Sequence, residues 1–281
     1  MRIAITGGTG LVGRFITRAA TRAGHDVVLL GRTPPGSLFP EARHMPWQLG
    51  ERPDLAGADA LIHAAFRHEP GRYRGGEGDD PEGFSRANLD GTLLLWEAAE
   101  RAGAHVAFLS TRAVYGDYAP GTRLTEDLPP RPDTLYGKVK LAAEEALGQG
   151  GASLRATGVY GPAGPGLDHK WTWLFRDFAA GAHISPRVAS EVHGEDLAAA
   201  VLTCLSLRAT GPLNVSDLVL DRRYLLRRVS ELTGIDGPLP DEADRSRVSE
   251  ADCSRLCDLG WRPGGWDRLE ADLPELIRAA L

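Results

Sequence analysis

The feature that most constrains this chain is a glycine-rich loop close to its first residue. The run Thr6-Gly7-Gly8-Thr9-Gly10-Leu11-Val12-Gly13 follows an apolar stretch, Arg2–Thr6, and precedes a helical pattern over 11–23. The first of the spaced glycines, at 7, 10 and 13, allows a tight turn. The second lets a pyrophosphate approach the backbone, and the third lets the helix pack closely. The free N–H groups of the helix would face the pyrophosphate. The sequence therefore predicts a dinucleotide-binding strand–loop–helix unit.

Further apolar runs alternate with amphipathic stretches along the first half of the chain. We expect strands over 26–30, 60–65 and 106–110, and helices over 88–102 and 136–147. Such alternation predicts an α/β fold with a doubly wound parallel sheet and helices on both faces. After Val159 the pattern loosens, and we expect a loop over 160–167. The remaining expected elements are a helix over 194–207, a short strand over 213–216 and a helix over 222–233.

Composition excludes several classes of protein. The net charge is −6 and no run of 18 apolar residues exists, so we expect neither a nucleic-acid partner nor a membrane partner. No basic and apolar leader precedes the first strand, and only three cysteines are present, which together favour a reducing cytoplasm. Cys253 and Cys257 lack the further ligands that a zinc site needs, so we expect no metal.

The end of the second expected strand indicates which dinucleotide is bound. An acidic residue there would bond the ribose 2′-hydroxyl of NAD. Here Gly31 takes that place and Arg32 follows it. Because a guanidinium suits a 2′-phosphate, we expect NADP(H) to be preferred, with NAD(H) as the alternative. Arg14 could assist Arg32.

A tyrosine and a lysine stand four residues apart at the start of the expected helix 136–147. Tyr136 and Lys140 therefore share one helix face. A phenol has an ordinary pKa of about 10 and is a poor base at neutral pH, but a nearby ammonium favours the phenolate. The same ammonium could bond the nicotinamide ribose. Ser110 and Thr111 end an expected strand, where a hydroxyl could hold a substrate oxygen beside Tyr136. This set indicates acid/base catalysis.

These features resemble the extended short-chain dehydrogenase/reductases, the NAD(P)-dependent sugar epimerase/dehydratase family. The resemblance covers nearly the whole chain. Its matching motifs are Thr6–Gly13, Asp59–Ala65, Asn88–Thr92, Ser110–Gly116, Tyr136–Lys140 with Glu144, Leu154-Arg155, Val159–Pro162, Val192–Asp196 and Leu259–Trp261.

The resemblance implies a Rossmann-like domain, 1–158 and 190–210, and a small C-terminal substrate-binding domain, 159–189 and 211–281. It also implies a homodimer through the helices at 88–102 and 136–147. The implied catalytic residues are Tyr136 as acid/base, Lys140 as its activator and Thr111 as the positioning hydroxyl. The implied or expected cofactor contacts are Gly7, Gly10, Leu11, Val12, Gly13, Arg32, His63, Ala64, Ala65, Ser110, Tyr136, Lys140, Val159 and Tyr160.

The chain also departs from the family pattern. Dehydratases of the family carry Thr-Asp-Glu where this chain has Thr111, Arg112 and Ala113, so we expect no dehydratase activity. Nucleotide-sugar enzymes usually have Asn in place of Gly158, and often Arg-Asp-Phe where this chain has Ala189–Glu191. These departures argue against a UDP- or dTDP-sugar substrate.

Other basic residues are candidates for holding the substrate. Arg112 could meet a carboxylate or phosphate bidentately, and Arg187 falls near an expected site position. Arg72 and Arg74 lie in the polar loop 66–83, for which a solvated surface is the competing interpretation.

The sequence thus predicts an NADP-preferring oxidoreductase. We expect it to interconvert a hydroxyl and a carbonyl on a polar small molecule, such as a sugar-derived one. The first alternative is an NAD-dependent sugar epimerase, in which hydride leaves the substrate and returns to its other face. A catalytically silent NADP-sensing module is a remote alternative, because such proteins usually lack the Tyr-Lys pair.

Overall fold

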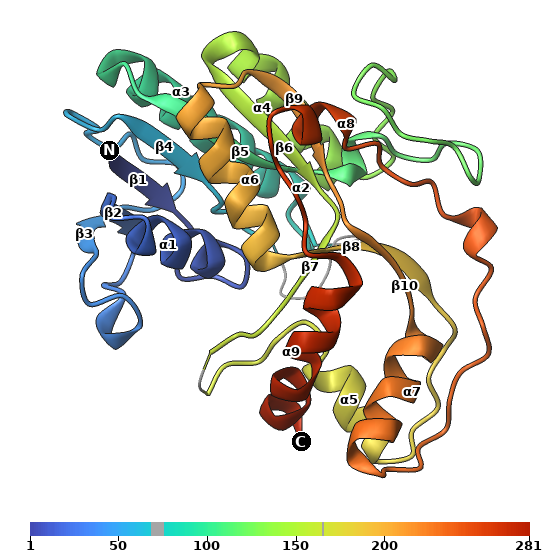
Figure 1. The fold of residues 1–281 in the computed structure, drawn as a ribbon. Helices are drawn as coiled ribbons and strands as arrows, with labels where there is room; N and C mark the ends of the chain where they lie inside the picture. Colours follow the sequence, from blue (N-terminus) through green and yellow to red (C-terminus); the bar gives the residue numbers. More distant parts are fainter. Residues whose placement is uncertain (69–75, 165) are drawn as a thin grey trace.

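A seven-stranded parallel sheet forms the centre of the molecule (Figure 1). The structure is a computed structural model that describes residues 1–68, 76–164 and 166–281. The strand order β3-β2-β1-β4-β5-β6-β9 reverses direction beside β1, which confirms the predicted Rossmann-like doubly wound sheet. The strands are β1 (Arg2–Thr6), β2 (Asp26–Gly31), β3 (Arg43–Pro46), β4 (Ala60–His63), β5 (His105–Thr111), β6 (Gly151–Ala156) and β9 (Gly211–Val215).

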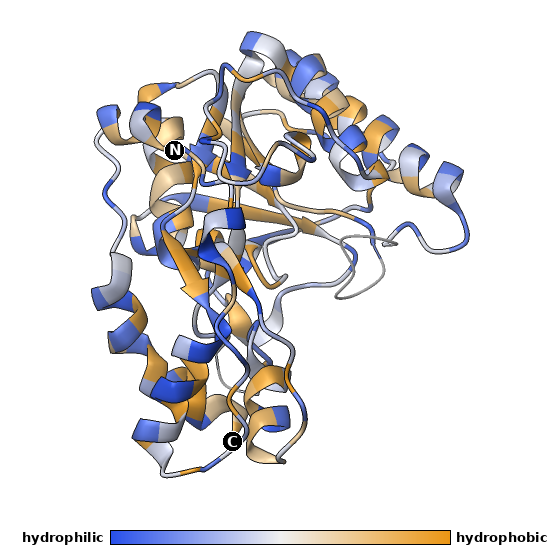
Figure 2. Cartoon of the chain, turned by 90° about the vertical axis from the view of Figure 1, so that its right-hand side faces the viewer, coloured by the Kyte–Doolittle hydropathy of each residue, from blue (hydrophilic) through white to orange (hydrophobic). Residues whose placement is uncertain are grey.

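Helices cover both faces of this sheet because each strand buries side chains on both sides. Ile3 and Ile5 of β1 face α1 (Gly13–Arg22) and α6 (Gly194–Leu207), within one apolar cluster. Ala4, between them, belongs to the opposite cluster with α3 (Gly91–Ala102) and α4 (Leu135–Leu147). Figure 2 shows the apolar strands enclosed between these helices.

The helix expected over 88–102 is built differently at its start. A short helix, α2 (Pro81–Ser85), leads into a π-helical turn, Arg86–Asp90, before regular α3 begins at Gly91. Asp80 caps α2 by accepting a hydrogen bond from the Gly83 backbone N–H. Other predicted elements agree within a few residues, and α6 has the expected bounds.

A smaller part lies beyond the carboxyl ends of the strands. Its three-stranded sheet has the order β10-β8-β7, with β7 (Gly158–Tyr160), β8 (Val188–His193) and β10 (Leu218–Asp221). The helices α5 (Thr172–Ala179), α7 (Arg222–Thr233) and α9 (Gly265–Ala280) bury a third apolar cluster. No helix in the described part of the chain could cross a membrane.

The division of the chain between the two parts differs from the predicted one at three places. β9 pairs with β6, so 211–215 belongs to the central sheet. Residues 190–193 lie in β8 and thus in the smaller sheet. The chain later returns through α8 (Ser254–Asp258), where Leu256 and Trp261 pack in the core beside α1 and α6. The two parts therefore share buried side chains. Figure 1 shows the path of this segment, which runs from α7 to α8 beside the central sheet and back to α9.

Candidate active site

The glycine loop has the close packing that its sequence predicts. Gly7 has a φ of 68°, and a Cβ there would lie 2.6 Å from the Ala65 backbone nitrogen. A Cβ on Gly13 would lie 2.1 Å from the Gly7 carbonyl oxygen. The backbone N–H of Gly10 donates to that same oxygen at 3.0 Å. Side chains at 7 and 13 would therefore open the loop.

This packing leaves donors free at the beginning of α1. The backbone N–H groups of Leu11, Val12 and Gly13 donate to no acceptor within 1–68, 76–164 and 166–281. Three such groups at a helix N-terminus form a binding site for an anion. The residues present therefore fit the diphosphate of a dinucleotide.

The segment after β4 lies beside the loop, but one of its predicted contacts is wrong. Ala64 and Ala65 donate their backbone N–H groups to Thr6, at 3.1 and 3.2 Å, and both are half-exposed. The His63 ring is only 1% exposed and is hydrogen-bonded at both nitrogens, to Thr6 and Thr92. Burial also holds the pKa of His63 well below its ordinary value. The His63 ring therefore supports the sheet, and neither of its nitrogens is available to a ligand.

Arg32 stands at the end of β2 with its side chain exposed. His44 and the Trp47 backbone N–H both bond the Gly31 carbonyl oxygen, at 2.9 and 3.1 Å, which fixes the backbone before Arg32. Arg32 has no ion-pair partner in the described part of the chain, so its guanidinium can meet a ligand.

The candidate catalytic pair, Tyr136 and Lys140, lies at the start of α4. Thr134 caps this helix by accepting from the Gly137 backbone N–H at 3.1 Å. Tyr136 and Lys140 both contact Phe66: the tyrosine ring meets it edge-on at 5.0 Å, and Lys140 Nζ lies 4.6 Å from its centroid. The sequence analysis missed Phe66, although its place directly after Ala64-Ala65 could have indicated it.

Lys140 is held in a nearly closed environment. It is 4% exposed, and its ammonium donates to the Leu109 carbonyl oxygen at 2.6 Å. The ammonium also lies 4.5 Å from the Phe108 ring centroid. Burial lowers the pKa of Lys140 to about 7, while the Glu144 carboxylate opposes that shift. A lysine in this setting can respond to nearby charge at neutral pH.

Thr111 ends β5, two residues beyond the carbonyl that Lys140 bonds. Its Oγ accepts from the Ala113 backbone N–H at 3.1 Å, so its own proton remains available for donation. β5 and α4 are neighbours, and thus Tyr136, Lys140 and Thr111 come from adjoining elements. The assignment of these three residues to one catalytic site stays a prediction.

Ser110 points the other way, and its predicted cofactor contact is not supported. Its hydroxyl donates to Glu144, which also forms a buried ion pair with Arg155 at 2.7 Å. Arg155 in turn donates to the Tyr115 hydroxyl at 3.1 Å, and Tyr115 donates to Asn214 at 2.8 Å. This buried network ties α4 to β5, β6 and β9.

The predicted contacts in β7 divide in the same way. Val159 is half-exposed and remains a candidate. Tyr160 is 1% exposed, stacks on Trp171 at 4.9 Å and packs against His193 at 5.1 Å. Burial and nearby carboxylates such as Asp217 raise the pKa of Tyr160. Tyr160 is therefore a core residue of the smaller part.

The candidate substrate arginines are held by different segments. Arg112 is half-buried and donates to the Ser249 carbonyl oxygen at 3.3 Å, while its Nε has no partner. Arg187 is exposed before β8, and its carbonyl oxygen accepts from the Arg222 backbone N–H at 2.9 Å. Arg72 and Arg74 lie outside the described residues.

A side chain at Gly158 would displace two charged groups from their present positions. A Cβ there would lie 2.2 Å from Lys170 Nζ and 2.4 Å from a carboxylate oxygen of Glu191. These two groups form an ion pair, in which burial lowers the pKa of Lys170 and raises that of Glu191. The pair therefore fills the space beside the Gly158 backbone.

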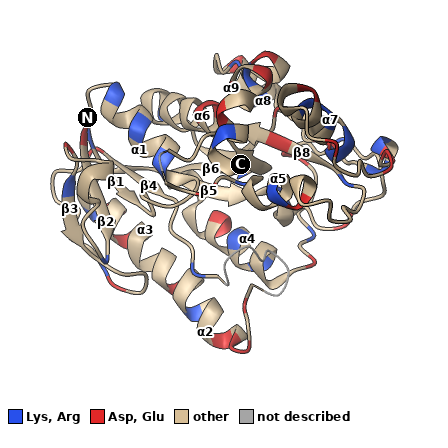
Figure 3. Ribbon diagram, turned by 90° about the horizontal axis from the view of Figure 1, so that it is seen from below, with Lys and Arg blue, Asp and Glu red and all other residues tan. Residues whose placement is uncertain are grey.

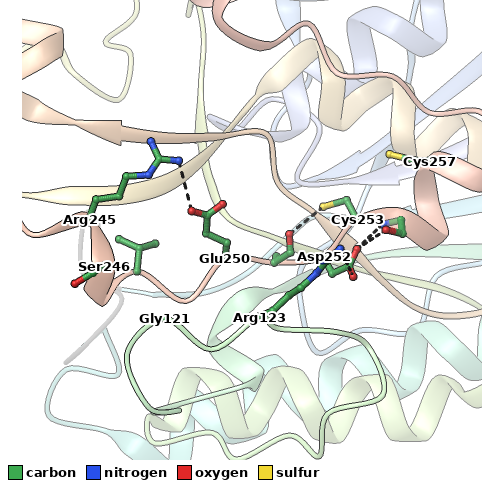
Figure 4. A pocket seen from close by; sticks show the side chains of 11 residues that line it. Gly121, Arg123, Arg245, Ser246, Glu250, Asp252, Cys253 and Cys257 are labelled. Carbon is green, nitrogen blue, oxygen red and sulfur yellow. Dashed lines mark hydrogen bonds and ion pairs between the residues drawn. The ribbon is translucent and has the colours of Figure 1, made fainter.

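A separate hollow of about 830 Å³ lies between the loop 117–134 and the segment 245–257 (Figure 4). An ion pair from Arg123 to Asp252, at 2.8 Å, joins the two segments, and Arg245 pairs with Glu250 within the second segment at 3.5 Å. Cys253 donates to the Ser216 carbonyl oxygen at 3.4 Å. No cluster suited to a metal ion occurs within the described ranges.

Comparison with known proteins identifies the class to which this fold and site belong. Residues 3–215 match the NAD dependent epimerase/dehydratase family. The chain belongs to this family, which confirms the resemblance.

Individual relatives carry different activities. A dTDP-glucose 4,6-dehydratase of Mycolicibacterium smegmatis is 28% identical over 99% of this chain and 92% of its own length. A ceramide reductase of Caulobacter vibrioides is 29% identical over 78% of this chain and 65% of its own length. The structure of Thermus thermophilus UDP-glucose 4-epimerase with NAD has 26% identity and a TM-score of 0.79, covering both chains completely.

Proposed function

We propose that this chain is an NADP-preferring oxidoreductase that interconverts a hydroxyl and a carbonyl on a polar, sugar-derived small molecule. The observation that carries the proposal is the shared packing of Tyr136 and Lys140 on Phe66, with the Lys140 ammonium fixed at Leu109 beside the end of β5.

Tyr136, Thr111 and Lys140 each have a separate role in the proposed reaction. A bound nicotinamide supplies or accepts the hydride. In reduction, the Tyr136 phenol donates its proton to the substrate oxygen; in oxidation, the phenolate removes that proton. The Thr111 hydroxyl donates a hydrogen bond to the same oxygen. Lys140 favours the phenolate through its positive charge.

Arg32 supports the preference for NADP(H), since an exposed guanidinium after β2 can pair with a 2′-phosphate. Arg32→Ala should weaken NADPH binding much more than NADH binding in a fluorescence titration. Equal losses for both would remove Arg32 from the site. NAD(H) is the alternative, because NAD is bound in the Thermus thermophilus relative.

Elimination of water by this site lacks support from its side chains. Arg112 and Ala113 follow Thr111 where dehydratases carry two carboxylates. The relatives include a dTDP-glucose 4,6-dehydratase. The argument against dehydratase activity in this chain therefore depends on Arg112 and Ala113 alone.

The second candidate function is a sugar epimerase, favoured by the likeness to a UDP-glucose 4-epimerase. It would need tightly held NAD and room for the substrate to turn. The Lys170–Glu191 pair at Gly158 and the Ala189–Glu191 run argue for a substrate without a nucleotide diphosphate. An NADP sensor without turnover would not need the Tyr136–Lys140 pair.

The deciding experiment is Tyr136→Phe. Removal of the phenolic hydroxyl should abolish turnover in a carbonyl-reduction screen, because the proposed mechanism assigns the transferred proton to this group. Fluorescence titration should give nearly unchanged NADPH affinity. Full activity in this variant would exclude the mechanism, and NAD that copurifies and resists removal would favour the epimerase.

We further propose that the enzyme acts in the cytoplasm as a homodimer through α3 and α4. Its partners would be small molecules, with neither nucleic acid nor membrane involved. The acidic net charge of −6 supports the absence of a nucleic-acid partner. Light scattering of the purified protein tests the dimer.

A further inference from the structure

Arg14, the residue after the third loop glycine, carries a buried guanidinium that is only partly satisfied by the described part of the chain. The side chain lies in the first turn of α1 and the residue is 3% exposed. Its Nε and one terminal nitrogen make no hydrogen bond. Native proteins rarely leave a charged group in this state, so each such group calls for an explanation.

The neighbours of Arg14 cannot supply the missing charge. Burial lowers the pKa of Arg14, and the positive charge of Arg18, one turn along the helix, lowers it further, to about 10. Glu195 faces this helix, but it pairs with Arg22 at 2.7 Å and with Arg18 at 3.8 Å. The Phe15 ring, 5.7 Å from the guanidinium carbon, offers only a weak contact.

The loop that covers this end of α1 does not supply an acceptor either. His169 accepts from the Trp171 backbone N–H with Nδ1, and its Nε2 donates to the Leu276 carbonyl oxygen at 2.8 Å. Asp168 lies against Arg176, at 3.7 Å. Within residues 1–68, 76–164 and 166–281, no carboxylate therefore pairs with the positive charge of Arg14.

We propose that Arg14 binds the diphosphate of the dinucleotide. The Arg14 backbone N–H donates to Gly10 at 3.1 Å, which sets this residue directly after the three unpaired N–H groups of Leu11, Val12 and Gly13. A guanidinium and free amides at one helix end both favour a phosphate oxygen. Figure 3 shows the basic positions of α1 in blue. The inference rests on the proposed binding of NAD(P)(H).

This assignment has an unusual consequence for stability. A buried charge without a partner destabilises the cofactor-free protein, whereas the bound diphosphate removes that penalty. Arg14→Met keeps most of the apolar side-chain volume and removes the charge. The variant should therefore be more stable than the wild type without dinucleotide, and should gain less stability when dinucleotide is added.

The experiment measures thermal unfolding of the purified full chain without ligand, and its Tm and Kd with NADPH, NADH and ADP-ribose. Arg14→Met should raise the Tm of the free protein. It should weaken all three ligands by roughly tenfold or more, the loss of a charge-assisted hydrogen bond. Arg14→Lys keeps the positive charge but loses the paired N–H donors of the guanidinium. This variant should leave the Tm of the free protein unchanged and bind all three ligands more weakly.

Arg18→Met is the matched control, because Arg18 lies on the same helix and already pairs with Glu195. It should leave all three Kd values unchanged. A lower Tm of free Arg14→Met with unchanged Kd values would overturn the proposal and make Arg14 a packing residue. A loss confined to NADPH would also overturn it, by assigning Arg14 to the 2′-phosphate. If the wild type bound none of the three ligands, the proposed function itself would fail.

Discussion

Burial decides which single residues can take part in proton transfer at this site. Lys140 is 4% exposed, and burial brings its pKa to about 7, so its charge is partly lost near neutral pH. An approaching phosphate or phenolate favours the charged form. The residue is therefore sensitive to ligand binding.

Lys140 should make stability depend on pH. Its folded-state pKa of about 7 lies below its ordinary value of 10.5, so the unfolded chain binds more protons between these limits. Unfolding free energy should accordingly rise as pH increases from 7 toward 10.5, and the burial penalty should be fully present below pH 7. Urea unfolding of the cofactor-free protein across this range measures the slope.

Lys140→Met provides the comparison, since it removes the titrating group and keeps the apolar stem. The variant should show a flatter dependence over the same pH range. Identical slopes in the two proteins would mean that Lys140 titrates in the folded state near its ordinary value.

Sequence motifs predicted the positions of site residues better than the directions of their side chains. The Tyr-Lys spacing on one helix face and the spaced glycines follow from local geometry. Ser110, His63 and Tyr160 fall within the right motifs but point into the interior. A motif places a residue at a strand end, whereas tertiary packing decides which face receives it. Arg14 and Phe66 gained their significance from contacts distant in sequence.

At the scale of elements, long helices were predictable, whereas two strands with a buried charged residue were not. The bounds of α6 and α7 follow from apolar periodicity and clear ends. The sequence analysis did not identify β6 or β8, whose buried residues include Arg155 and Glu191. These side chains are tolerated because partners on other elements neutralise them, which apolar patterning does not reveal.

Substitution of Glu144 measures how much a buried ion pair between two elements contributes to the unfolding free energy. Its carboxylate on α4 pairs with Arg155 on β6 and accepts from Ser110 on β5. Glu144→Gln leaves the Arg155 charge buried without compensation and should lower the unfolding free energy by about 3–5 kcal/mol. Ser110→Ala removes one hydrogen bond and should lower it by about 1 kcal/mol. Chemical denaturation measures both, and equal losses would contradict the assigned ion pair.

At the scale of the whole molecule, the chain passes repeatedly between the two sheets. The central sheet takes its last strand, β9, from the second half of the sequence, and β8 and β10 flank it in sequence but lie in the smaller sheet. A linear division into domains could not show this. The return of 253–261 to the main core depends on contacts with α6 that no local pattern reveals.

Trp261 allows the contribution of the segment 253–261 to stability to be measured. It is 2% exposed, packs in the core beside α1 and α6, and its Nε1 donates to the Asp196 carbonyl oxygen at 2.8 Å. Because the two parts share this buried contact, fluorescence and far-UV circular dichroism should report one coincident unfolding transition. Trp261→Ala should lower the unfolding free energy by about 3–5 kcal/mol through the cavity that it leaves.

Trp173 on α5 is the matched control, since it is the same residue type with 65% of its surface exposed. Trp173→Ala should change stability by no more than about 0.5 kcal/mol. Two separate transitions in the wild type, or equal effects of both substitutions, would mean that the smaller part folds independently. The return segment 253–261 would then not help to hold the sheet on which the glycine loop and Lys140 depend.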